Sequence, residues 1–273
     1  MAQVDSERVR EEIISILDTY TAAVCKVTEA YAGRRTKERD INWLALQAAK
    51  EYGAARVHAG IMLDKAKAMA ALEDIEKSHG DAFEEVEHYH GYMKVLAWLL
   101  QGEPIPVPDF WGYGDFQAPT FLPGPGLRRE RWPWNHAFFS TGMDYLLHAS
   151  SPWIRRAMIT SIEGAAVGFH YAMSRLPRSD GLLERIHVLE QSVVDDELHH
   201  GPEVIDEIAA EPPREAVFNE ALEKIWHLRE LELYQRNEQF LQPMTEDEVR
   251  DLARAMRAKA IAPVDLYRSA LRS

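Results

Sequence analysis

Five Glu-x-x-His pairs occur in the sequence, and two of them belong to a repeat. Glu85 and His88 recur as Glu197 and His200 at one constant offset, which no other two of the five pairs share. The remaining pairs are Glu76/His79, Glu87/His90 and Glu184/His187. A glutamate and a histidine three residues apart lie on one side of a helix. Both types are common metal ligands, so the spacing indicates a duplicated metal-binding motif.

Two further glutamates complete the repeat. Glu51 and Glu163 are related by the same offset, so each precedes its Glu-x-x-His pair by an equal stretch of chain. Tyr92, Val95 and Leu99 continue the helix face that carries Glu85 and His88. An apolar stripe of this kind predicts that the face points into a core. The three unrelated pairs are expected on solvated faces or at a helix end.

Four carboxylates and two imidazoles on core-facing stripes would be costly to bury without partners. Two divalent metal ions would neutralise them. Mixed oxygen and nitrogen ligands suit iron or manganese, whereas a structural zinc site favours thiolates. The sequence has a single cysteine, Cys25. We therefore expect two bound ions, iron in the first place and manganese as the alternative.

Helices are the elements expected to position these residues, because apolar residues recur at helical spacing and serial strand-like alternation is missing. The chain is predicted to be all-α. Ser151-Pro152 is expected to open one helix, and Thr245 with Glu248 to form a capping box. The predicted helices span residues 5–32, 39–78, 80–101, 152–176, 180–210, 213–240 and 245–260 or beyond.

Residues 101–151 differ in composition from the rest of the chain. Seven prolines from Pro104 to Pro133 interrupt any continuous helix, and glycine and aromatic residues are frequent. A connection of this length is uncommon in a compact domain unless it is functional or disordered. Its aromatic content argues against disorder. We expect an ordered crossover that packs on the helices, either as the roof of a substrate cavity or as a structural strap.

The ligand pattern resembles the ferritin-like di-metal carboxylate proteins, in which a glutamate from each of two helices joins a Glu-x-x-His from each of the other two. The resemblance covers residues 40–210. It implies one domain over 1–273: a ferritin-like four-helix bundle with a long third-to-fourth-helix crossover, an extra N-terminal helix and accessory C-terminal helices in 213–273. The resemblance assigns six metal ligands, which are Glu51, Glu85, His88, Glu163, Glu197 and His200. Of these, Glu85 and Glu197 are expected to bridge the two ions.

The same resemblance implies residues that support the ligands. Many oxygen-activating members have an aspartate directly before the glutamate of each Glu-x-x-His, where it hydrogen-bonds a ligand histidine. Asp196 holds this position in the second motif. Glu84 holds it in the first motif and departs from the family pattern, so only one of the two supporting contacts is expected in its usual form.

Three more residues are candidates for roles near the ions. His58 and His170 each follow their glutamate by seven residues, about 10.5 Å along a helix, which is too far to share the same ions. We expect buried, hydrogen-bonded histidines, with substrate contact or proton relay as the alternative. Tyr92, one turn after His88, matches the position of the radical tyrosine in ribonucleotide reductase small subunits. We expect it to hydrogen-bond a ligand carboxylate instead.

Small residues follow Glu51 and Glu163, the two glutamates that precede the repeated Glu-x-x-His pairs. The sequence reads EYGAA from Glu51 and EGAAVG from Glu163. A glycine inside a helix costs about 0.5–1 kcal/mol relative to alanine. Its repeated use at these places indicates either close helix packing or a pocket for dioxygen and substrate. The sequence leaves both interpretations open.

Within the family that the ligand pattern resembles, the long crossover is more similar to the oxygenases and the ribonucleotide reductase small subunits than to the ferritins. The function expected from the resemblance is that of a non-haem di-iron oxidase or oxygenase, which uses O2 to oxidise a small, largely apolar organic substrate with electrons from an external donor or from the substrate. The alternatives are a ferroxidase, a manganese catalase or a peroxidase-like protein. An alternative of another class is a non-catalytic ferritin-like partner subunit.

Charge and composition exclude several other classes. The net charge of −13 disfavours nucleic acid and anionic lipid as partners. No run of about 18 apolar residues occurs, which argues against a membrane-spanning chain. The lone cysteine and the charged N-terminal stretch DSERVREE favour a cytoplasmic protein without a secretion signal. A homodimer is expected.

Overall fold

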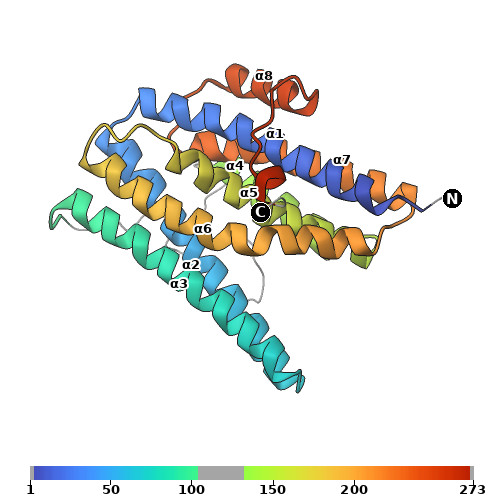
Figure 1. The fold of residues 1–273 in the computed structure, drawn as a ribbon. Coiled ribbons are helices and arrows are strands. Elements are labelled where there is room, and N and C mark those ends of the chain that lie inside the picture. The colour runs from blue at the N-terminus through green and yellow to red at the C-terminus, as the bar shows by residue number, and fades with distance from the viewer. Residues whose placement is uncertain (1–2, 104–131, 271–273) are drawn as a thin grey trace. The chain divides into compact units, whose positions relative to one another are not determined.

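The structure is a computed structural model that describes residues 3–103 and 132–270 of the 273-residue chain, without the side chains of 199–203. Within these residues every regular element is a helix, which confirms the all-α prediction (Figure 1). No helix in the described ranges is both long and apolar enough to cross a membrane. The helices are α1 (Ser6–Gly33), α2 (Lys37–Lys67), α3 (Leu72–Leu100), α4 (Pro133–Leu147), α5 (Pro152–Ser174), α6 (Gly181–Ala210), α7 (Glu215–Gln239), α8 (Glu246–Arg257) and α9 (Tyr267–Ala270).

The chain divides into two compact units. The first unit combines Met1–Arg35 with Arg129–Ser273, and the second is Thr36–Arg128. In the first unit α5 packs against α6, α1 and α7, while α4 packs on α7. The second unit is a hairpin in which α2 and α3 run side by side (Figure 1). Each unit carries one of the two sets of sequence-predicted ligands.

The core of the first unit contains a charged group as well as apolar side chains. On α7, Glu232 lies 3.0 Å from Arg229 and 3.2 Å from Arg236, and all three are buried. Arg229 donates to the carbonyl of Ser161 on α5 at 2.6 Å, and the guanidinium of Arg236 lies 3.8 Å from the ring centroid of Phe169. Charges at such depth require partners. The triad thereby ties α7 to α5.

Helix caps follow the predicted signals in the first unit. Ser151 accepts from the backbone N–H of Ile154 at the start of α5, with proline in the first turn. The capping box of Thr245 and Glu248 opens α8. Helix α4, which lies inside the 101–151 segment, was not predicted from the sequence. Pro133 stands in its first turn, where proline needs no hydrogen-bond partner; residues 104–131 of the segment lie outside the described ranges.

The turn of the second unit lies elsewhere than the sequence predicted. We placed the helix boundary at residues 78–80, but α2 ends at Lys67 and α3 begins at Leu72, so that Gly80 lies inside α3. Met69 adopts the left-handed conformation at φ 57°, and the N–H of Ala70 donates to the carbonyl of Lys65 at 3.0 Å. The turn is built without glycine or proline, so the usual sequence signals did not mark it.

Candidate metal centre

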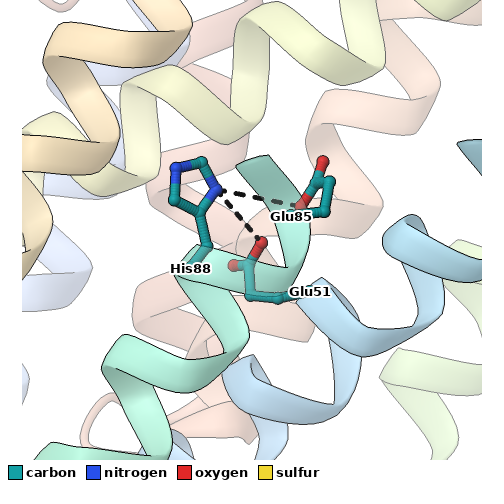
Figure 2. A group of neighbouring side chains, drawn as sticks. All are labelled: Glu51, Glu85 and His88. Atoms are coloured by element: carbon teal, nitrogen blue, oxygen red, sulfur yellow. Dashed lines mark ion pairs between the residues drawn. The ribbon is translucent and has the colours of Figure 1, made fainter. Parts of the chain in front are cut away.

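Helices α2 and α3 bring Glu51, Glu85 and His88 together. Nδ1 of His88 lies 3.8 Å from Oε2 of Glu85 and 4.0 Å from Oε2 of Glu51 (Figure 2). One ligand atom from each residue lies within 4.8 Å of the other two. Two ligand atoms that each stand about 2.1 Å from one ion are at most about 4.2 Å apart. The two distances to His88 are therefore within the span of a single ion.

The hydrogen bonding of this group fits a cation. Oε2 of Glu85 is buried and has no hydrogen-bond partner among the described residues. A buried carboxylate oxygen without a partner is unfavourable, and native proteins rarely leave one. An ion between Glu51, Glu85 and His88 would satisfy it. Two carboxylates and an imidazole are the donor types that iron and manganese accept.

The surroundings of the group hold the ligands in place. The amide of Gln47, one turn before Glu51, donates to Oε1 of Glu51 at 2.5 Å, while Oε2 is the oxygen nearer to His88. Tyr92 is completely buried one turn after His88, with its ring edge-on to Trp43 at 6.1 Å between centroids. Gln47 was not among the residues predicted from the sequence. Its position four residues before a ligand glutamate was the signal that could have identified it.

His58 and Glu84 lie further along the same hairpin. Nδ1 of His58 is 3.7 Å from Oδ2 of Asp81, and the histidine is partly exposed. Burial lowers the pKa of His58, against the opposing effect of the negative charges on Asp81 and Glu84. Glu84 is itself partly exposed on α3. His58 is thus less buried than the sequence predicted.

The second ligand set lies on α5 and α6 of the first unit. Glu163 is exposed on α5, and Glu197 is partly exposed on α6. His200 belongs to α6, with its side chain outside the described residues. Burial raises the pKa of the Tyr267 phenol well above its usual value, and the negative charges of Glu197 and Glu163 add to this effect. Both carboxylates therefore lie near one buried phenol.

Two other predicted residues flank this set. Asp196 is exposed on α6. His170 is buried on α5, and its Nδ1 lies 2.7 Å from Oε2 of Glu190, which is buried on α6. The pair stands two turns from Glu163 and Glu197 along their helices. It forms a separate polar contact between α5 and α6.

The three unrelated Glu-x-x-His pairs lie at the surface. Glu87 and His90 are exposed on α3. In the third pair, His187 is partly buried, and its Nδ1 lies 2.6 Å from the carbonyl oxygen of Ser174. Glu76 and His79 are exposed inside α3, so the expectation that they stand at a helix end was wrong. The misplaced helix boundary caused that error.

The glycines that follow Glu51 and Glu163 in the sequence serve different purposes. A Cβ at Gly164 would lie 2.6 Å from Cδ1 of Leu17, and one at Gly168 would meet Oγ1 of Thr21, so both allow α1 to approach α5. A Cβ at Gly53 would meet nothing within 4 Å. Close packing therefore explains the glycines of α5. Gly53 has open space around its Cβ position, on a side of α2 that differs from that of Glu51.

Comparison of the chain with models of known protein families, with curated proteins and with solved structures gave no match. The residue types, their spacing and the geometry of the Glu51, Glu85 and His88 group are therefore the features that bear on function.

Proposed function

We propose that the chain is a non-haem di-iron oxidase or oxygenase of the ferritin-like carboxylate type, which uses O2 to oxidise a small, largely apolar organic substrate. The observation that carries the proposal is the convergence of Glu51, Glu85 and His88 around a buried carboxylate oxygen without a hydrogen-bond partner. The recurrence of the same three residue types at one constant offset supports a second ion.

Six side chains would hold the two ions. Glu51, Glu85 and His88 supply one set, and the repeat assigns Glu163, Glu197 and His200 as the other. Mixed carboxylate and imidazole ligands suit iron and also accept manganese. When bound, two ferrous ions would supply electrons for the reduction of O2. Further electrons would come from an external donor or from the substrate.

The residues of the hairpin have definable tasks in this account. Metal binding requires ionised carboxylates and a neutral imidazole at His88. Gln47 engages one oxygen of Glu51 and leaves the other oriented toward His88. The hydrogen bond from Gln47 fixes the orientation of the Glu51 carboxylate, as hydrogen bonds from residues around the ligands do at metal centres. Tyr92, one turn after His88, and Trp43, one turn before Gln47, are completely buried and place apolar rings next to these residues along their helices.

Small, uncharged residues follow Glu51 on α2 as Gly53, Ala54 and Ala55. Ala54 and Ala55 are three and four residues after Glu51 and therefore share its helix face, whereas Gly53 points to another side of the helix. We propose that the short side chains of Ala54 and Ala55 leave room for O2 and a small, apolar substrate.

The direct test is oxygen uptake by the ferrous protein. The full chain, stripped of metal with a chelator and loaded anaerobically with two equivalents of Fe²⁺, is mixed with oxygenated buffer in an oxygen electrode. We expect uptake faster than that of Fe²⁺ in buffer alone. Glu85→Gln should abolish the excess uptake, and His90→Gln on the exposed face of α3 should leave it unchanged. Equal rates in protein and buffer would rule the proposal out.

A further inference from the structure

The C-terminal segment of the first unit is held by a buried aspartate. Oδ1 of Asp18 on α1 accepts from the backbone N–H groups of Leu266 at 3.2 Å and Tyr267 at 3.0 Å. The backbone carbonyl of Asp18 accepts from the N–H of Val264 at 3.1 Å. Asp18 is only 3% exposed. Asp18 thus docks this segment onto α1, and an exposed ion pair between Arg268 and Glu11 of α1 at 3.2 Å adds to the contact.

Docking carries the side chain of Tyr267 to α5. Its hydroxyl donates to the backbone carbonyl of Gly164 at 2.7 Å, and the residue is completely buried. A Cβ at Gly164 would lie 3.3 Å from that hydroxyl oxygen, so the close approach depends on glycine. Glu163 directly precedes Gly164. The phenol therefore contacts α5 at the residue next to a predicted metal ligand.

The charges around Tyr267 identify its neighbours. Glu197 on α6, Asp18 on α1 and Glu163 on α5 each act electrostatically on the phenol. The two glutamates come from different helices, and both belong to the repeated ligand pattern. Because the hydroxyl proton is donated to the Gly164 carbonyl, the phenol acts on Glu163 through the backbone of α5 and not as a donor to the carboxylates. None of the C-terminal residues had been assigned such a role from the sequence.

We infer that the C-terminal segment is a latch for the second ligand set, in which Asp18 docks the chain end and Tyr267 positions Glu163 and Glu197 for a divalent cation. The inference rests on the proposed function, since it concerns ligands of the same protein. Tyr267 is a positioning residue, because its hydroxyl contacts the backbone of α5. By linkage, a cation bound to these glutamates must stabilise the docked segment as much as docking favours the cation.

The test is a titration of the chelator-treated full chain with Mn²⁺ alone, followed by calorimetry. Tyr267→Phe removes the hydroxyl and keeps the ring. We expect its Mn²⁺ affinity to fall about three- to tenfold, the range for one lost hydrogen bond. The matched control is Tyr31→Phe, because Tyr31 is also completely buried but stacks on Phe240. A purely structural role would lower the melting temperature of both metal-free variants and leave Mn²⁺ affinity unchanged.

Variants of Asp18 test the docking step. Asp18→Ala removes the acceptor, so residues 264–270 should exchange their amide hydrogens faster and Mn²⁺ affinity should fall as in Tyr267→Phe. Asp18→Asn keeps an acceptor oxygen and should retain both properties. The double variant Asp18→Ala/Tyr267→Phe should lose no more affinity than either single variant, since both act through one contact. In the unmodified chain, Mn²⁺ should slow the exchange of these amides.

The outcomes separate the latch from the proposed function. Mn²⁺ binding in the unmodified chain with full affinity in Tyr267→Phe would overturn the latch alone. Additive losses in the double variant would overturn it as well. No Mn²⁺ binding in the unmodified chain would overturn both proposals together.

Discussion

Nδ1 of His88 on α3 lies 4.0 Å from Oε2 of Glu51 on α2, although the turn of the hairpin separates the two residues along the chain. The distance is set by the packing of the hairpin and is within the span of two ligands of one ion. Because Glu51 lies on α2 and His88 on α3, the two side chains meet only when the two helices pack against each other. The hairpin is thus the element on which the candidate metal centre depends.

Glu85→Gln should separate metal binding from stability. The substitution keeps the shape of the side chain and removes a buried charge whose Oε2 has no hydrogen-bond partner among the described residues. Without metal, we expect a melting temperature that is unchanged or higher, because a neutral amide is cheaper to bury. Mn²⁺ affinity should fall more than tenfold. Calorimetry and thermal unfolding measure the two effects.

The matched control for this substitution is Glu87→Gln, two residues further along α3 on the exposed face. It should change neither the melting temperature nor Mn²⁺ affinity. Loss of metal in Glu87→Gln would show that the wrong face of α3 had been assigned.

Alanine at two glycines should have opposite effects. Gly53→Ala adds a methyl group in open space inside α2 and should raise the free energy of unfolding by about 0.5–1 kcal/mol. Gly168→Ala brings the methyl group against Thr21, whose hydroxyl donates to the carbonyl of Leu17 at 2.8 Å. Overpacking of this kind costs about 1–3 kcal/mol. Urea unfolding tests both, and equal effects would refute the assignment of tight packing to α5 alone.

Asp18 should make stability depend on pH. Burial raises its pKa from 3.8 to about 6, so the folded chain keeps a proton that the unfolded chain releases between about pH 4 and 6. The contribution of Asp18 to stability must therefore fall as pH rises through this window. Asp18→Asn does not titrate. Its free energy of unfolding, relative to the unmodified chain, should increase by on the order of 2–3 kcal/mol from pH 4 to pH 7.

If the difference in free energy of unfolding between Asp18→Asn and the unmodified chain did not change from pH 4 to pH 7, the raised pKa assigned to Asp18 would be wrong. Asp265→Asn serves as the comparison: burial is the main cause of the raised pKa of Asp18 and the charge of exposed Asp265 only adds to it, so this variant should keep most of the pH dependence.

Tyr92→Phe distinguishes a structural tyrosine from a radical carrier. Tyr92 is completely buried one turn after His88. If its hydroxyl only makes a hydrogen bond, the variant should lose about 0.5–1.5 kcal/mol of stability and retain most oxygen uptake. The ferrous chain exposed to O2 should then show no persistent tyrosyl signal in electron paramagnetic resonance. A stable signal that disappears in Tyr92→Phe would assign the radical role.

Much of the fold could be predicted because the relevant signals are local. Helical spacing marked the main helices, and Thr245 with Glu248 marked the start of α8. The proximity of Glu85 and His88 followed from their spacing of three residues. Glu51 was added only by the constant offset of the repeat, and the hairpin brings it to His88.

Other features depend on contacts that no local pattern encodes. The turn at Met69 uses a left-handed residue without glycine, so the boundary was misplaced. Tyr267 reaches Gly164 across 103 residues, because Asp18 docks the chain end. Such contacts arise from the packing of distant segments, and composition or periodicity carries no trace of them.

The most direct test of the central claim is the metal content of the purified chain. The protein is expressed in iron-replete medium, purified without chelators and analysed by inductively coupled plasma mass spectrometry against the protein concentration. The account predicts close to two ions per chain, chiefly iron or manganese, and clearly fewer in a Glu85→Gln/His88→Gln variant. A folded, stable chain that contains no metal, both as purified and after incubation with Fe²⁺ or Mn²⁺, would contradict it.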